Sequence, residues 1–214
     1  MYTLERVSSF IKSYIHDDEG ELGNIYQDAV KNGVPVMRPE TRELIKTQLL
    51  IKKPQNILEI GTAVGYSSLY ISKYLANGSK ITTIELDGER YKQAVGNIKR
   101  LDKEDVITVI KGDASEVLKT LPDKEFDFAF VDAAKGQYIN YLPDVLRIVK
   151  SGGLIISDNV LQDGDILESH YLVEKRNRTI HDRMREYLYV LNNDERLETA
   201  ILSVGDGVAL SVRK

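Results

Sequence analysis

Apolar and polar positions change their spacing near residue 56, and the change predicts a helical N-terminal region followed by a strand–helix core. Before this point apolar residues recur at helical spacing. Three helices are expected there, at Leu4–Tyr14, Glu21–Asn32 and Pro39–Ile51. Beyond it, short apolar runs alternate with amphipathic segments, which is the pattern of a parallel doubly wound sheet with helices on both faces.

Five apolar runs predict the parallel strands of this core, and a polar stretch separates them from two closing strands. The five runs are Asn56–Ile60, Lys80–Ile84, Val106–Ile110, Phe126–Val131 and Gly153–Ile156. The helices between them are expected near Ser67–Leu75, Gly88–Arg100, Ala114–Thr120 and Gln137–Val149. The polar stretch, a further helix and the closing strands are Leu161–Arg178, Thr179–Leu191, Leu197–Val204 and Val208–Arg213. Gly205, Asp206 and Gly207 predict a short hairpin turn between the closing strands.

Length and composition predict one globular domain. The chain has 214 residues, of which 42% are hydrophobic, and shows no repeat, linker or low-complexity tract. Residues 1–54 form the helical region, expected to serve the substrate or a dimer contact, and residues 55–214 form the catalytic core. The net charge of −4 gives no overall attraction for nucleic acid, so RNA binding would need a local basic patch.

Several absences in the sequence predict a cytoplasmic protein with no membrane partner. There is no cysteine, which excludes disulfides and thiolate metal sites. No apolar run reaches the roughly 18 residues of a membrane helix. Met1–Arg6 lacks the charged and then apolar layout of a secretion signal.

Polar residues follow the fourth and fifth core strands directly, as Asp132–Lys135 and Ser157–Asn159. If these strands are neighbours, both runs meet at the carboxyl edge of the sheet, where open α/β folds bind ligands. Asp132, Asp158 and Asn159 offer the oxygen donors that suit Mg²⁺, with Mn²⁺ as the alternative. Solvated loop residues are the simpler interpretation of each run taken alone.

The histidines give no support for a zinc site. His16, His170 and His181 have no ligand spacing to one another, and we expect them at the surface.

The turn after the first core strand predicts a nucleotide-type cofactor without a diphosphate. Gly61 supplies a tight turn, but Ala63 stands where a dinucleotide fingerprint needs its second glycine. Glu59, just before the turn, also disfavours a diphosphate and favours a cofactor with a cationic end, such as S-adenosylmethionine (SAM).

Two further strands end in acids that fit such a cofactor. Glu85 lies 24 residues after Gly61, where an acid that holds ribose hydroxyls is expected. Asp113 follows the third strand and could reach an adenine amino group or cap the next helix; both roles can coexist. The predicted cofactor residues are Met37, Glu59, Gly61, Ser67, Glu85, Asp113, Ala114 and Asp132.

Taken together, these motifs resemble the class I cation-dependent O-methyltransferases, which include catechol and caffeoyl-coenzyme A O-methyltransferases. The segments that carry the resemblance are Leu58–Gly61, Ile84–Asp87, Gly112–Ala114, Val131–Lys135, Asp158–Asn159 and Val204–Val208. The resemblance implies a Rossmann-like, seven-stranded, mostly parallel sheet with an antiparallel last strand, and a homodimer. Ala134 departs from the plant enzymes, which usually have a second Asp there, so a plant-type substrate is in doubt.

The expected chemistry is methyl transfer to a metal-bound hydroxyl. Asp132 would hold the metal, and Lys135 could accept the hydroxyl proton, a role that the resemblance also implies. The alternative for Lys135 is an exposed lysine at a helix start. Chelation calls for two adjacent acceptor oxygens, which both catechols and 5-hydroxyuridine provide.

A basic segment bears on the choice of acceptor. Tyr171–Tyr187 holds five basic and three acidic residues, and its two tyrosines could stack on bases. Arg38, Arg42 and Lys46 could add a second basic face. A solvated helix face is the alternative.

A second resemblance favours RNA as the acceptor. The segment Arg176–Met184 is similar to the matching segment of the bacterial branch of the family, whose members methylate 5-hydroxyuridine at the tRNA wobble position, in the anticodon region. The predicted RNA contacts are Arg38, Lys175, Arg176, Arg178 and Arg183. A small-molecule O-methyltransferase and a non-catalytic cofactor- or RNA-binding module stay open as alternatives. A nicotinamide-dependent oxidoreductase is disfavoured by Ala63.

Overall fold

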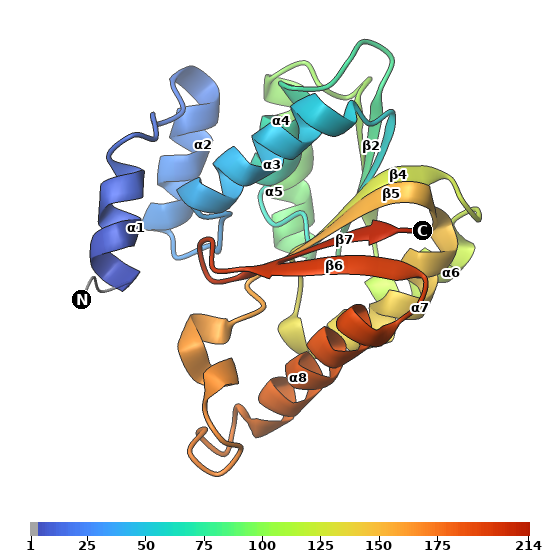
Figure 1. Ribbon diagram of the computed structural model, residues 1–214. Coiled ribbons are helices and arrows are strands. Elements are labelled where there is room, and N and C mark those ends of the chain that lie inside the picture. The colour runs from blue at the N-terminus through green and yellow to red at the C-terminus, as the bar shows by residue number, and fades with distance from the viewer. Residues whose placement is uncertain (1–3) are drawn as a thin grey trace.

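The computed structural model describes residues 4–214 and contains one seven-stranded sheet (Figure 1). The strand order is β3-β2-β1-β4-β5-β7-β6. Strands β1 to β5 pair in parallel, whereas β7 runs antiparallel to both of its neighbours. The predicted Rossmann-like sheet with an antiparallel last strand is therefore confirmed. Residues 1–3, on which the prediction about a secretion signal partly depends, lie outside the described part.

The strands lie close to their predicted positions. They are β1 (Asn56–Ile60), β2 (Lys80–Glu85), β3 (Ile107–Lys111), β4 (Phe126–Val131), β5 (Val149–Asp158), β6 (Leu197–Leu202) and β7 (Val208–Arg213). Strand β5 is longer than predicted. Its first residues include Gly152 and Gly153, which carry no apolar signal, but its apolar half pairs with β4 on one side and β7 on the other. At its start, β5 is extended by the pairing of Val149 with Phe126 of β4, across a register shift.

Helices cover both faces of the sheet (Figure 1). The first five are α1 (Leu4–Lys12), α2 (Gly20–Lys31), α3 (Pro39–Lys52), α4 (Tyr66–Ser72) and α5 (Gly88–Arg100). The others are α6 (Ala114–Thr120), α7 (Tyr138–Ile148) and α8 (Arg178–Asn193), with 3-10 turns η1 (Lys135–Gln137) and η2 (Gln162–Leu167). The η1 turn separates Lys135 from the helix that was predicted to begin at Gln137.

Two apolar cores hold these layers together. Helices α2 to α5 pack on one face, where Ile45, Leu49 and Phe128 are fully buried. Helices α6 to α8 pack on the other, around Tyr138, Tyr187 and further buried apolar side chains. Burial of this kind stabilises the fold by about 25 cal/mol per Å² of apolar area. The loops at the carboxyl edge of the sheet carry the site described next.

Within residues 4–214, no helix combines the length and the apolar character needed to cross a membrane.

Candidate active site

A cavity of about 760 Å³ opens at the carboxyl edge of the sheet. Most of the predicted cofactor and catalytic residues line it. These are Met37, Gly61, Ser67, Glu85, Asp113, Ala114, Asp132, Lys135 and Asn159. Glu59 and Asp158 are buried behind this lining. The topology brings the residues together because β1, β2 and β4 are neighbours and their ends share one edge.

The turn at Gly61 joins the cofactor side of the cavity to the Asp132 side. Gly61 has a φ of +102°, and a Cβ on it would lie 2.0 Å from the carbonyl oxygen of Asp132. The Gly61 amide donates to Ile84, and the Asp132 amide donates to Ile60. Only glycine fits both the backbone conformation and the close approach. The turn thus fixes the distance between two halves of the site.

Glu59 lies beneath the turn and is fully buried. It accepts hydrogen bonds from the Ser68 hydroxyl and from Thr83 Oγ1, the latter at 2.5 Å. Its second oxygen, Oε1, is buried without a hydrogen-bond partner. Burial raises the pKa of Glu59, although the neighbouring hydroxyls oppose the rise.

Glu85 and Asp113 bind backbone groups with their carboxylates while they line the cavity. Glu85 accepts from the amides of Ala63 at 2.7 Å and Asp87 at 2.8 Å. Asp113 accepts from the amide of Ser115 at 2.8 Å and from its hydroxyl at 2.7 Å. Asp113 therefore caps α6, as the alternative interpretation predicted, and these hydrogen bonds lower its pKa.

Asp132, Asp158 and Asn159 meet where β4 and β5 end. Asn159 Nδ2 donates to Asp132 Oδ1 at 3.1 Å, and the Asn159 amide donates to Asp158 Oδ1 at 2.8 Å. Thr41 Oγ1 donates to the same Asp158 oxygen at 3.3 Å. Asn159 has a φ of +58°, a left-handed conformation that asparagine tolerates better than most residues. The predicted convergence of these three side chains is confirmed.

One of the two carboxylates of this group, that of Asp158, lacks a partner that its burial requires. Asp158 is 1% exposed, and its Oδ2 has no hydrogen-bond partner. Burial raises the pKa of Asp132 and of Asp158, and for Asp158 the nearby Asp132 charge adds to the rise. A positive charge between the carboxylates would relieve both effects. An all-oxygen donor set with an unpartnered buried oxygen fits Mg²⁺ or a similar hard cation.

Lys135 is held beside this group by Asp206, a residue that the sequence had assigned only to a turn. Lys135 Nζ lies 3.4 Å from Asp206 Oδ2. Asp206 is 5% exposed, and its other oxygen accepts the amide of Asp163. In the sequence, only its position between two glycines of a hairpin turn singles out Asp206. Asp206 is thus a positioning residue for Lys135.

Thr41 and Tyr138 also support the carboxylates and were not anticipated. Thr41 is fully buried and reaches Asp158 from α3, while the Tyr138 hydroxyl donates to the Asp158 carbonyl at 3.1 Å. Thr41 has no sequence signal because α3 lies far from β5 in the chain, and Tyr138 has none because its position reads only as part of the apolar face of α7.

The predicted RNA-contact residues divide into exposed and structural ones. Lys175 and Arg176 are exposed, although Arg176 pairs with Glu174 at 2.7 Å. Arg178 donates to the carbonyl of Val173, and Arg183 donates to that of Gly136 at 3.0 Å. Tyr187 is buried in the core, so the prediction that it stacks on bases is wrong; its apolar ring completes the α7–α8 contact.

The predicted basic face on α3 is also wrong. Arg42 is 2% exposed and forms a 2.9 Å ion pair with Asp18. Lys46 pairs with Glu43 on the same helix. Arg38 is partly exposed and pairs with Asp163 at 2.7 Å. Arg38, Arg42 and Lys46 are therefore paired with acids that lie near them in the fold. The spacing of the basic residues in the sequence does not show these pairs.

The histidine prediction needs a correction as well. His181 is 1% exposed, and the rings of His170 and His181 lie near each other and near Asp182. The chain between them folds back onto α8, so residues without local ligand spacing become neighbours. His16 is exposed, as expected.

Comparisons with solved structures define the fold as that of a methyltransferase. The SAH-bound methyltransferase of Podospora anserina superimposes with a TM-score of 0.85 at 25% identity, over 98% of this chain and 94% of that one. The O-methyltransferase of Bacillus cereus, in complex with SAH, has the same fold, with a TM-score of 0.84 at 24% identity over 98% and 97% of the two chains.

Sequence comparison gives the family. The profile of the O-methyltransferase family matches residues 13–214. A caffeoyl-CoA O-methyltransferase of Populus kitakamiensis is 35% identical over 96% of this chain and 94% of its own. The catechol O-methyltransferase of Niastella koreensis is 28% identical over 98% and 97%. The chain belongs to the O-methyltransferase family, and it is a SAM-dependent O-methyltransferase.

Proposed function

We propose that this enzyme methylates the 5-hydroxyl of 5-hydroxyuridine at the wobble position of tRNA, with a divalent cation held by Asp132, Asp158 and Asn159. The observation that supports the cation is a buried Asp158 oxygen without a hydrogen-bond partner, next to Asp132, which lines the cofactor cavity. Three protein oxygens leave coordination positions for an acceptor with two adjacent oxygens. In 5-hydroxyuridine these are the 5-hydroxyl and the C4 carbonyl.

Each residue of the site has a separate task in this proposal. A divalent cation, when bound, lowers the pKa of the acceptor hydroxyl and orients it. Lys135 lines the same cavity as Asp132 and takes up the hydroxyl proton at Nζ. Asp206 keeps the Lys135 amine turned towards the carboxylates. The Gly61 turn sets the separation of methyl donor and acceptor, and such positioning supplies much of the rate.

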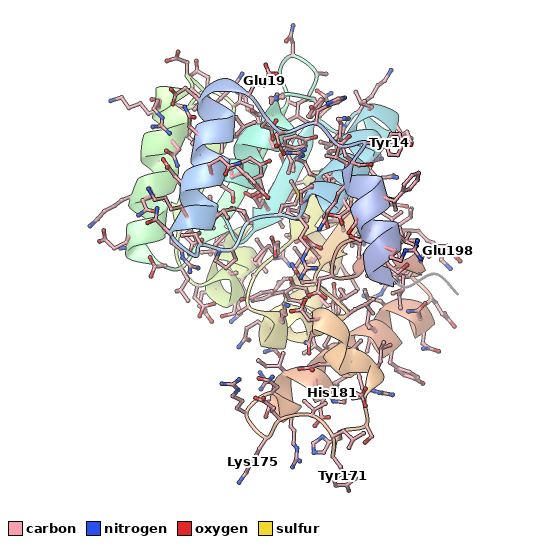
Figure 2. All side chains as sticks on the ribbon, turned by 90° about the vertical axis from the view of Figure 1, so that its left-hand side faces the viewer. Tyr14, Glu19, Tyr171, Lys175, His181 and Glu198 are labelled. Atoms are coloured by element: carbon pink, nitrogen blue, oxygen red, sulfur yellow. The ribbon has the colours of Figure 1, made fainter. Side chains whose placement is uncertain are left out.

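The segment between β5 and α8 supports an RNA acceptor. Figure 2 shows Lys175 and Tyr171 pointing outward at one end of the molecule. Tyr171 is 83% exposed, and the Arg176 side chain is 81% exposed. The same segment contacts the site, because the amide of Asp163 binds Asp206. Exposed cations and an aromatic ring, on a segment that also contacts the site, can provide phosphate contacts and base stacking.

A small-molecule acceptor is the second candidate. It is favoured by the relatives whose names specify caffeoyl-CoA or catechol. The same donor oxygens would chelate a catechol, so the site chemistry does not separate the two acceptors.

One experiment decides between them. Purified enzyme, labelled SAM and Mg²⁺ are incubated either with catechol or with tRNA that contains 5-hydroxyuridine, taken from cells that lack the enzyme. The proposal expects label at 5-hydroxyuridine, and EDTA should abolish its incorporation. Turnover of catechol with no label in tRNA would transfer the assignment to small molecules.

A pair of charge reversals tests the RNA contact directly. Lys175→Glu together with Arg176→Glu should lower kcat/KM for tRNA at least about tenfold, because phosphate contacts dominate such affinity. Turnover of any small acceptor should be unchanged. Lys92→Glu with Lys119→Glu, two exposed lysines on α5 and α6, is the matched control. Equal losses from both pairs would contradict a contact at Lys175 and Arg176.

We also propose that the enzyme is a homodimer. Helix α1 leaves Val7, Phe10 and Ile11 exposed, with Tyr14 just beyond it, which is more apolar surface than a free helix usually shows. Light scattering should give twice the chain mass, and Phe10→Asp should shift it to the monomer.

A further inference from the structure

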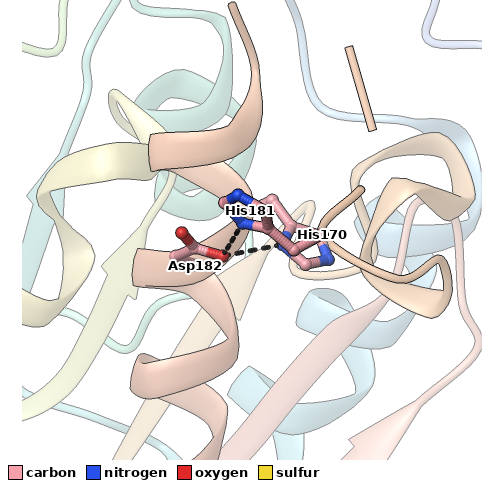
Figure 3. A group of neighbouring side chains, drawn as sticks. All are labelled: His170, His181 and Asp182. Carbon is pink, nitrogen blue, oxygen red and sulfur yellow. Dashed lines mark hydrogen bonds and ion pairs between the residues drawn. The ribbon is translucent and has the colours of Figure 1, made fainter. Parts of the chain in front are cut away.

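His170, His181 and Asp182 form a compact group outside the cofactor cavity (Figure 3). Asp182 Oδ1 lies 2.8 Å from His170 Nδ1 and 3.2 Å from His181 Nδ1. One ligand atom from each residue lies within 4.8 Å of the other two. The three atoms therefore converge on a common point.

The hydrogen bonds of His181 leave one of its nitrogens facing a carboxylate. His181 Nε2 lies 3.1 Å from the carbonyl oxygen of Glu168, which can only accept, so Nε2 carries a hydrogen. In a neutral ring Nδ1 then presents a lone pair to Asp182 Oδ1. Two acceptors at this distance repel each other. A positive species, either a proton or a metal ion, is needed between them.

The ligand types select the metal. Two imidazole nitrogens and one carboxylate oxygen suit Zn²⁺ and neighbouring transition metals, in contrast to the all-oxygen set at Asp132 and Asp158. Bond lengths of about 2.0–2.2 Å place tetrahedral ligand atoms about 3.4 Å apart. Asp182 Oδ1 lies 2.8 and 3.2 Å from the two histidine nitrogens, so small shifts of the side chains would suffice. Metal-bound histidines also donate their other N–H to a carbonyl or carboxylate, as His181 does to Glu168.

We propose that His170, His181 and Asp182 bind a Zn²⁺-type ion at a second site. His170 belongs to the segment after η2, whereas His181 and Asp182 belong to the first turns of α8. The ion therefore fastens that segment to α8, and with it the exposed Lys175 and Arg176. This inference stands on the geometry of the three ligands and is independent of the acceptor.

Zinc binding to the whole enzyme tests the proposal. Metal-free enzyme is titrated with Zn²⁺ by calorimetry in excess Mg²⁺, which fills the oxygen site. The wild type should bind one Zn²⁺, and His170→Gln and Asp182→Asn should each weaken it by about 10- to 100-fold or more. His16→Gln is the matched control and should bind as the wild type does. His181 is left intact because its ring is buried and is hydrogen-bonded to the Glu168 carbonyl.

A second measurement reports on the segment itself. Trypsin cleaves after Lys175 and Arg176, and Zn²⁺ should slow this cleavage in the wild type but not in His170→Gln. Equal Zn²⁺ affinity in all variants would overturn the proposal. So would a loss of Zn²⁺ binding caused by Asp158→Asn instead. Nitrogen NMR could also find both His181 nitrogens protonated in saturating Zn²⁺. A proton, and not a metal ion, would then lie between His181 Nδ1 and Asp182 Oδ1, and the proposal would be overturned.

Discussion

The two halves of the active-site edge use their carboxylates in opposite ways. At the ends of β2 and β3, Glu85 and Asp113 are satisfied by backbone amides and a hydroxyl. At the ends of β4 and β5, Asp158 is buried near the partly exposed Asp132, and one Asp158 oxygen has no hydrogen-bond partner. The carboxylates of the first half are satisfied by the protein itself, whereas the second half keeps a buried Asp158 oxygen that the protein leaves without a hydrogen-bond partner.

Because of this difference, we expect amino-acid substitutions in the two halves to have different effects on activity and stability. A satisfied carboxylate stabilises the local backbone, so its loss mainly affects structure. A buried, unpaired carboxylate costs free energy that only function explains. Substitutions at the β4–β5 edge should therefore reduce activity more than stability, and those at the β1 turn should reduce both.

The largest effect is expected for Asp158→Asn. Removal of one negative ligand should lower kcat/KM at least about 10³-fold, since stabilisation of charge by a metal is worth several kcal/mol. The folded protein should be at least as stable without metal, because a buried charge is removed. Asp105→Asn, at the opposite end of the sheet, is the control and should leave activity unchanged. Steady-state kinetics and urea denaturation measure the two quantities, and an active Asp158→Asn enzyme would refute the cation site.

Lys135→Met should lower kcat by about 10²-fold, which is the usual contribution of a general base. The KM for SAM should stay the same. Lys135→Arg keeps the charge beside Asp206 but cannot release its proton at neutral pH, so it should be equally impaired. Nearly full activity in Lys135→Arg would mean that the charge orients the acceptor and that no proton passes through this residue.

Gly61→Ala should lower the free energy of unfolding by about 2 kcal/mol or more, from a strained φ combined with the contact to the Asp132 carbonyl. Gly78→Ala provides a matched control. Gly78 also has a positive φ, of +88°, but no atom lies within 4 Å of its Cβ position. Gly78→Ala should lower the free energy of unfolding only through the backbone strain, by about 1 kcal/mol. Similar urea midpoints for the two variants would show that the close approach is not decisive.

The smallest expected effect is a change in the stability of the metal-free enzyme with pH. Because burial raises the pKa of Asp132 and Asp158, the unfolded chain releases these protons at lower pH than the folded chain does. Metal-free enzyme should therefore lose stability, on the order of 1 kcal/mol, as pH rises from the acid range to neutrality. Mg²⁺ should restore stability at neutral pH and have little effect in acid. Asp158→Asn should flatten both trends in urea midpoints recorded across this range.

Much of this site could be predicted from the sequence, because its main residues follow apolar strands directly. Asp132 and Asp158 each come after a run long enough to read as a buried strand, and parallel strands bring their carboxyl ends together. The sheet itself was predicted for the same reason. Gly61 was found because its turn chemistry is local.

Contacts between distant segments could not be predicted in this way. Asp206 reaches Lys135 across 71 positions of the chain, and Thr41 reaches Asp158 across 117. Helix periodicity likewise failed to show that Arg42 is neutralised by Asp18, because their pairing depends on how the segment before α2 packs. A cluster of basic residues in the sequence shows only that the charges are present. Whether these charges are exposed and free to bind a ligand depends on tertiary structure.

The hairpin that carries Asp206 has a consequence for synthesis of the enzyme. Strand β7 fills the position between β5 and β6, and its hairpin supplies the contact that holds Lys135. Residues 197–213 are the last of the described elements to leave the ribosome. Until they do, β5 is an edge strand and Lys135 lacks its partner. The contact between Asp206 and Lys135 therefore forms only once β7 and its hairpin have joined the sheet, later than the turn at Gly61 can form.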